Sequence, residues 1–182
     1  MQAQDILQFW FVELSGQQRF AKDSALDNLI RERFGAALQA GSRGELFTWR
    51  TTPQGRLAEI VVLDQFSRNI YRDTPAAFAQ DAQALTLAQE LIASGQDYVL
   101  EPAWRSFAYM PYMPYMHSES PVIHIQAMAL FAQTGMEGTL GYERRHKAII
   151  DQFGRFPHRN AILGRISTMQ ELEFLAQPGS SF

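Results

Sequence analysis

Three short segments of the sequence concentrate side chains that bind anions or transfer protons. They span residues 64–72, 117–119 and 155–160, and most of their polar residues are arginine, asparagine, histidine or acids. Guanidinium groups bind carboxylates and phosphates through paired hydrogen bonds, whereas histidine and glutamate transfer protons or bind metals. If the segments meet in the folded chain, they predict a site for an anionic ligand.

In the first segment, Asp64 and Arg68 are four residues apart, so within a helix they can form an ion pair. Arg68 and Arg72 can offer forked donors to a carboxylate or phosphate. The alternative is structural, because such an ion pair fastens a helix end and Asn69 suits a left-handed turn. Both interpretations stay open, and the candidate ligand-binding residues here are Asp64, Arg68, Asn69 and Arg72.

The second segment offers His117 and Glu119 as an acid–base pair or as two metal ligands, and no metal can be named from this spacing. We take both as candidate catalytic residues. The alternative makes Ser118 the N-cap and Glu119 a first-turn acid of a helix that begins near Val122.

Outside these segments, His146 shares a helix face with Tyr142, Ile149 and Phe153, so it is expected to point inward. Such a histidine is often a hydrogen-bonded core residue. It becomes a candidate ligand-binding residue if His117 or His158 approaches it.

The third segment places strong donors around Pro157. We take His158 as a candidate catalytic residue, and Arg155, Arg159 and Asn160 as candidate ligand-binding residues. The alternative is a solvated charged turn. The chain has no phosphate-binding glycine loop, nucleophile elbow or His-Glu-x-x-His motif, so no known catalytic signature supports a reaction class.

Helical periodicity surrounds all of these segments and β-type alternation is almost absent, which predicts an all-α fold. Thr-Pro and Ser-Pro pairs at residues 52–53, 74–75 and 120–121 are helix-start signals. The segment 122–132 is apolar on most sides, so we expect it to be the central helix. The predicted helices span residues 4–14, 25–40, 53–66, 75–93, 122–132, 139–153 and 168–175.

Composition limits the class of protein. A chain of 182 residues with 46% hydrophobic residues predicts a single domain over 1–182. There are no cysteines, no signal-like start and no run long enough to span a membrane, so we expect a cytoplasmic protein. A net charge of −3 argues against nucleic acid or an anionic membrane as a partner. Basic residues nevertheless cluster between 144 and 165.

Seven segments together carry a resemblance to a known family: residues 6–11, 20–23, 30–34, 63–69, 117–119, 155–160 and 163–168. In these segments the sequence resembles the bacterial family known as domain of unknown function 924. The resemblance implies an all-helical fold of antiparallel hairpins similar to a tetratricopeptide-like superhelix, and it implies no established activity or cofactor. This chain departs from the family pattern by a duplicated Pro-Tyr-Met at Pro114–Met116, just before His117.

Two functions follow from these patterns. The first is a small anionic-ligand-binding or hydrolase-like pocket lined by the Arg, Asn and His residues. The second is a tetratricopeptide-like scaffold that binds a peptide, such as an acidic tail, in a helical groove. Surface shape discriminates between them, because exposed Tyr109, Tyr112 and Tyr115 would favour the scaffold. The sequence does not indicate an oligomeric state.

Overall fold

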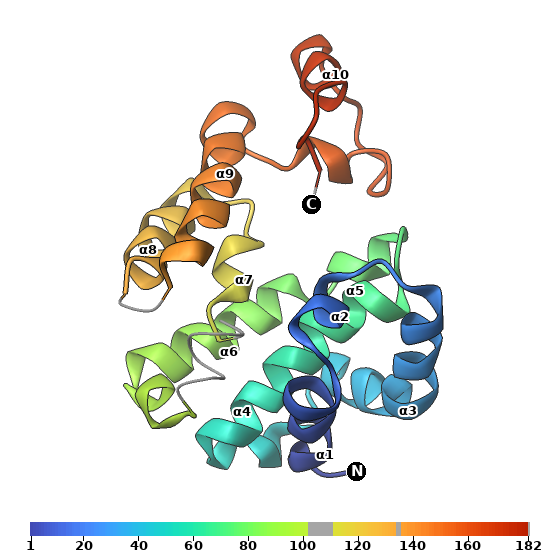
Figure 1. Ribbon diagram of the computed structural model, residues 1–182, viewed down its shortest axis with the longest axis vertical. Helices are drawn as coiled ribbons and strands as arrows, with labels where there is room; N and C mark the ends of the chain where they lie inside the picture. Colours follow the sequence, from blue (N-terminus) through green and yellow to red (C-terminus); the bar gives the residue numbers. More distant parts are fainter. Residues whose placement is uncertain (102–110, 134–135, 182) are drawn as a thin grey trace.

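The computed structural model describes residues 1–101, 111–133 and 136–181, and within them it contains helices and turns but no strand (Figure 1). The predicted all-α class is therefore confirmed. Shorter π- and 3-10-helical turns cover Gln8–Glu13, Phe47–Thr51, Val61–Phe66, Pro75–Phe78, Gln96–Val99 and Pro157–Arg159. The α-helices are α1 (Ala3–Leu7), α2 (Gly16–Phe20), α3 (Ser24–Ser42), α4 (Pro53–Ile60), α5 (Ser67–Ile70), α6 (Asp81–Ala93), α7 (Met113–Met116), α8 (Pro121–Phe131), α9 (Glu137–Phe153) and α10 (Met169–Leu175).

Side-chain caps fix several helix starts where the sequence predicted them. Asp23 accepts hydrogen bonds from the backbone of the first turn of α3, and Thr52 accepts one from Gly55 ahead of α4. Thr168 and Glu171 form a reciprocal capping box at α10. At the other end of a helix, Gly154 ends α9 with a left-handed φ of 67°, which glycine adopts without strain.

The central helix is not the one that we expected from the sequence. The most deeply buried element is the continuous run of α4, Val61–Phe66 and α5, and α1, α3 and α6 pack around it. In α8, by contrast, Val122 is 65% exposed and Ile125 is 63% exposed. The prediction for 122–132 was wrong because this helix packs mainly on α9 and α7, so its other face meets solvent.

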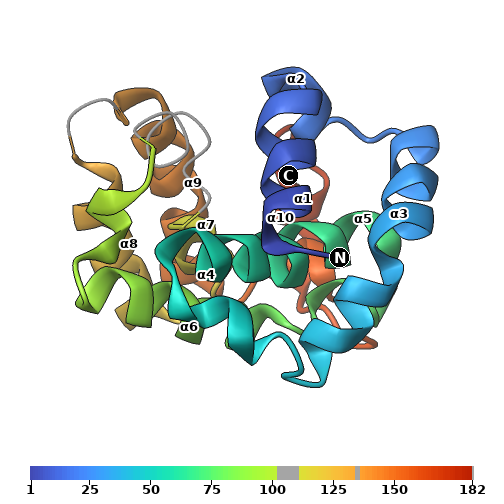
Figure 2. The same ribbon diagram turned by 90° about the horizontal axis from the view of Figure 1, so that it is seen from below.

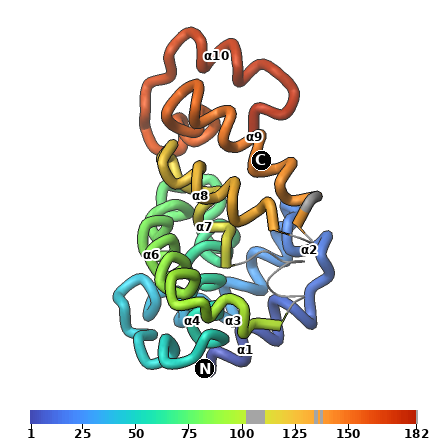
Figure 3. Tube along the Cα trace, turned by 90° about the vertical axis from the view of Figure 1, so that its left-hand side faces the viewer, coloured from blue at the N-terminus to red at the C-terminus, as the bar shows by residue number. Residues whose placement is uncertain are grey.

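Along its long axis the molecule runs from α1 and α4 at one end to α10 at the other (Figures 1 and 3). Seen from below, α3 lies on one side and α8 and α9 lie on the other (Figure 2). Among the described residues, α8 and α9 pack on each other more extensively than any other two elements do. The finer expectations of a tetratricopeptide-like superhelix and of a single domain stay predictions. No helix among the described residues is long and apolar enough to cross a membrane.

Candidate functional site

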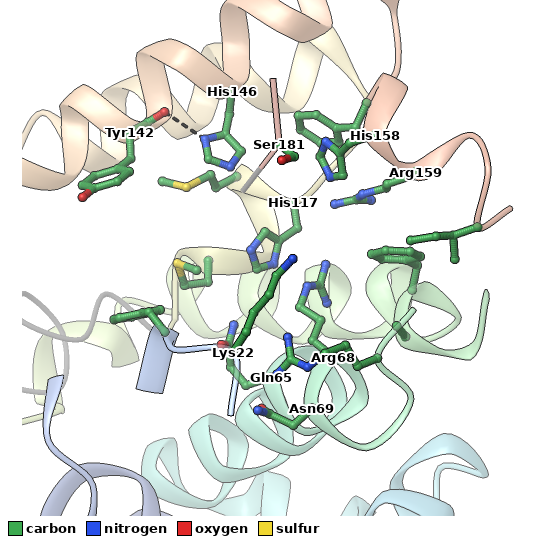
Figure 4. Close-up of a pocket in the computed structure, with 18 of the residues that line it drawn as sticks. Lys22, Gln65, Arg68, Asn69, His117, Tyr142, His146, His158, Arg159 and Ser181 are labelled. Atoms are coloured by element: carbon green, nitrogen blue, oxygen red, sulfur yellow. Dashed lines mark hydrogen bonds between the residues drawn. The ribbon is translucent and has the colours of Figure 1, made fainter. Parts of the chain in front are cut away.

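A cavity of about 770 Å³ lies where the three polar segments come together (Figure 4). Its walls come from the α2–α3 turn, the end of the central helix, α7, α9, the turn after α9 and the C-terminal tail. Ligand pockets in proteins commonly enclose roughly 300–1,000 Å³. Among the sequence-predicted residues, those that line it are Arg68, Asn69, Arg72, His117, His146, His158 and Arg159.

Beneath one wall of the cavity, Asp64 links two of these side chains. Its carboxylate lies 2.7 Å from Nδ1 of His117 and 3.0 Å from Nη1 of Arg68, and Asp64 itself is buried. The i,i+4 ion pair between Asp64 and Arg68 is therefore confirmed. The side-chain amide of Gln65 donates a further hydrogen bond to Asp64.

The charge state of this group follows from its partners. Burial favours the neutral acid, but the interactions with His117 and Arg68 outweigh it and lower the pKa of Asp64 below its usual value. Burial, together with the nearby Arg68, lowers the pKa of His117. Asp64 is thus an ionised acceptor and His117 is a neutral donor through Nδ1. Nε2 of His117 forms no hydrogen bond with any other described residue, so it is available to a ligand.

Arg159 is held in an unusual environment at one side of the cavity. Its guanidinium carbon lies 4.6 Å from the ring centroids of both Phe78 and Phe156, and the residue is only 6% exposed. Its single ion pair is a long 3.3 Å contact from Nη1 to Asp81, and the buried Nε has no hydrogen-bond partner in the described structure. Burial and the neighbouring Arg68 lower the pKa of Arg159 to about 10.

Two further histidines line the cavity as neutral side chains. Burial lowers the pKa of His158 to about 4, with Arg159 adding to the shift. Burial lowers the pKa of His146 to about 3, although its Nδ1 donates a hydrogen bond to the backbone carbonyl of Tyr142. Figure 4 shows His117, His146 and His158 around the same space. The condition set for His146 as a ligand-binding candidate is therefore met, because it lines the same cavity as His117 and His158.

The lining of the cavity carries excess positive charge. Among the described residues that line it, the only carboxylate is Asp73. Arg68 and Arg72 are neutralised by carboxylates from behind the wall, whereas Lys22 and Arg145 form no ion pair with a described carboxylate. Instead, Arg145 lies over the Tyr142 ring, 4.4 Å from its centroid. The cationic lining residues are Arg19, Lys22, Arg68, Arg72, Arg145 and Arg159.

Arg72 and Asn69 have a structural role besides lining the cavity, because both donate hydrogen bonds to Asp27. Asp27 of α3 accepts two hydrogen bonds from Arg72, at 2.6 and 2.7 Å, and one from the amide of Asn69 at 2.8 Å. This cluster fastens α3 to the end of the central helix. Asn69 is therefore a tie between helices, in an α-helical turn rather than the left-handed turn considered from the sequence.

Three other candidates do not reach this cavity, because their polar atoms are bound elsewhere. Glu119 accepts hydrogen bonds from Arg165 and from the backbone N–H of Phe156. Ser120, not Ser118, is the N-cap residue of α8, so the capping alternative was also wrong. Arg155 pairs with Glu171 of α10.

Asn160 is the third candidate outside the cavity, and it is fully buried. Its side-chain amide donates a hydrogen bond to Ser167 and accepts one from Arg165.

A smaller hollow of about 400 Å³ adjoins the cavity. Glu119 and Asp81 line this hollow, and Phe78, His117 and Arg159 line both spaces. The described residues contain no group of three or more His, Asp or Glu side chains that could hold a metal ion.

The duplicated Pro-Tyr-Met segment forms part of the wall. Its last four residues make the single turn α7, with Pro114 in the first turn, and His117 follows directly as C-cap. Met113 and Met116 line the cavity. Tyr112 and Tyr115 are buried, so the exposure that would favour a scaffold is absent at these two positions. Tyr109 lies outside the described residues.

Several lining residues were missed by the sequence reasoning. Lys22 falls inside segment 20–23, which contributed to the family resemblance, but a lone lysine in a turn gave no chemical signal. Phe78 and Gln65 gave none either, because their types suit any core or helix. Arg145 was visible only as one member of a basic cluster.

The comparisons with known proteins agree with the resemblance. The family described as bacterial protein of unknown function (DUF924) matches residues 6–179 of the chain. The solved structure of a protein of unknown function, ATU0120 from Agrobacterium tumefaciens, is similar, with 36% sequence identity over 96% of each chain and a TM-score of 0.89. A search of curated proteins gave no match.

Proposed function

Because this chain belongs to the DUF924 family of bacterial proteins of unknown function, its relatives assign it no activity, and we propose that its cavity binds a small anionic molecule. The environment of Arg159 carries this proposal. A guanidinium that is buried between two rings, with Nε unpaired and only one long ion pair, lacks most of the hydrogen bonds it can make. A carboxylate or phosphate would supply them.

The surrounding charges support the same ligand class. Lys22 and Arg145 add positive charge, since neither forms an ion pair with a described carboxylate. The neutral His158 can donate or accept a hydrogen bond. A negative ligand would relieve the repulsion between Arg68 and Arg159 that lowers the pKa of Arg159. A cation or an uncharged ligand would leave that repulsion in place.

We further propose that the site is hydrolase-like, with His117 as the general base. Asp64 holds the imidazole with its proton on Nδ1, which leaves the Nε2 lone pair for the cavity. Nε2 would take a proton from a water molecule as the water oxygen bonds to the acyl carbon or phosphorus of an ester. It would then give that proton to the oxygen of the departing alcohol, so atoms and charges balance.

Thermal unfolding with inorganic phosphate and with acetate tests the binding proposal. A ligand at 100 times its dissociation constant adds about 2.7 kcal/mol to the free energy of unfolding, which raises Tm by roughly 5–10 °C in a chain of this size. We expect Arg159→Met to abolish the shift and Arg43→Met, at an exposed site outside the cavity, to keep it. If neither anion raises Tm of the unmodified protein at tens of millimolar, the proposal fails.

The partner that we propose is thus a small anion in a cytoplasmic setting, rather than nucleic acid or a membrane surface. The peptide-binding scaffold gains no support, because Tyr112 and Tyr115 are buried.

A further inference from the structure

Resting on the proposed anion site, we infer that the ligand is amphipathic, with one anionic head group and an apolar body of several carbon atoms. The cavity of about 770 Å³ is far larger than a free oxyanion of five heavy atoms requires. Its volume falls in the range of pockets that enclose drug-sized molecules. The lining of such pockets is mostly apolar. The remaining volume has room for an apolar body of several carbon atoms beside the head group.

The two sides of the cavity differ in chemistry. Arg68, Arg159 and His158 lie together on one side, whereas Tyr142 and His146 lie on the other (Figure 4). The sulfur atoms drawn in that figure lie on the side of Tyr142 and His146. The cavity wall thus provides the buried and poorly paired Arg159 as an anchor at one side. The other side has thioether and aromatic surface, with the guanidinium of Arg145 over the Tyr142 ring. Methionine adapts its shape to apolar ligands and contacts them favourably.

Two large hydrophobic side chains at the cavity are about half exposed. Phe20 is 50% exposed and Tyr142 is 52% exposed, and they come from segments far apart in the chain. Both belong to the lining of the same cavity, so an apolar ligand there would cover them. A lone phosphate or acetate at the arginines would not cover them. The apolar surface of both side chains would then stay in contact with water, which is unfavourable.

The test measures binding affinities by isothermal titration calorimetry for two series of ligands. The phosphate series is inorganic phosphate, ethyl phosphate, butyl phosphate and hexyl phosphate. The carboxylate series is acetate, butyrate and hexanoate. Each buried methylene should tighten binding about fourfold, so butyl phosphate should bind roughly fifteen times more tightly than ethyl phosphate. The arm with the steeper and tighter series identifies the head group. If inorganic phosphate or acetate binds and its alkyl series is flat, this inference is wrong while the anion site stands. If no member of either series binds, the anion site itself is refuted.

Variants locate the apolar part. Tyr142→Ser removes an exposed ring, leaves the backbone carbonyl that holds His146, and should reduce the gain per methylene without weakening binding of inorganic phosphate. Tyr98→Ser, at a tyrosine of similar exposure outside the cavity, is the matched control and should keep the full gain. An unchanged gain in Tyr142→Ser would overturn the placement of the apolar body at this end.

Discussion

The guanidinium groups of Arg68 and Arg159 share a single carboxylate, that of Asp81. Arg68 donates two hydrogen bonds to Asp81, at 2.8 and 3.0 Å, whereas Arg159 donates only one, at 3.3 Å. Arg68 also pairs with Asp64, which in turn holds His117. The unequal sharing makes Arg159 the group that gains most from a bound anion.

Replacing Arg159 with methionine should abolish anion binding without unfolding the protein. Arg159 is a poorly paired buried charge, and Asp81 keeps Arg68 as a partner, so an apolar side chain between Phe78 and Phe156 should leave the free energy of unfolding within about 1 kcal/mol of the unmodified value or above it. Urea denaturation measures this without ligand. A loss of about 3 kcal/mol or more would show that Arg159 is a structural residue.

The neutral form of His117 should carry its proton on Nδ1. An ionised carboxylate only accepts hydrogen bonds, and Asp64 lies 2.7 Å from that nitrogen. Long-range ¹H–¹⁵N correlation spectra of the imidazole, assigned by loss of the signals in His117→Gln, distinguish the two tautomers. Observation of the proton on Nε2 would remove the basis for His117 as general base.

Anion affinity should rise as the pH falls from 7 towards 4. The pKa of His158 is about 4 in the free protein, lowered by burial and then by Arg159, with Arg165 and Lys22 acting in the same sense and Glu119 opposing. A bound anion raises that pKa, so binding takes up a proton and affinity gains up to about tenfold per pH unit for one coupled group.

Sulfate is the suitable probe for this pH dependence, because its charge is constant over the range. His158→Gln should flatten the pH profile that titration calorimetry measures for the unmodified protein. A profile that is flat or reversed in the unmodified protein would contradict the assignment.

The Asp27 cluster should stabilise the protein at neutral pH and lose its effect in acid. Burial opposes ionisation, but the hydrogen bonds from Arg72 and Asn69 lower the pKa of Asp27 below its usual value. A lowered folded-state pKa stabilises the protein above the unfolded value of about 3.9 and loses that effect as the pH falls below it. Asp27→Asn should therefore cost about 2–3 kcal/mol at pH 7 and progressively less below pH 4.

Urea denaturation at pH 7 and near pH 3.5 measures that difference. Asp23→Asn, on the same helix, is the matched control, because asparagine caps helices about as well as aspartate. Equal costs for Asp27→Asn at both pH values would show that its ionisation contributes nothing.

Local and nonlocal features of the sequence differed in how far they could be predicted. The helix starts near residues 25, 53 and 168 were predictable, because the caps that fix them, at Asp23, Thr52 and Thr168, involve residues within three positions of one another. The central helix was misassigned, since an apolar composition on all sides does not say how many neighbours a helix has. Likewise Arg155 and Arg159 are neighbours of the same type, but one binds Glu171 and the other faces the cavity.

The sequence by itself therefore determined most of the longer helices, several of their caps and the supply of arginines and histidines, including the Asp64–Arg68 pair. Only the tertiary structure decided which of these side chains form one site. The contact between Asp64 and His117 joins residues 53 positions apart, and that between Arg159 and Asp81 joins residues 78 apart. Caps depend on atoms within one helical turn, whereas convergence depends on how whole helices pack, which no local pattern specifies.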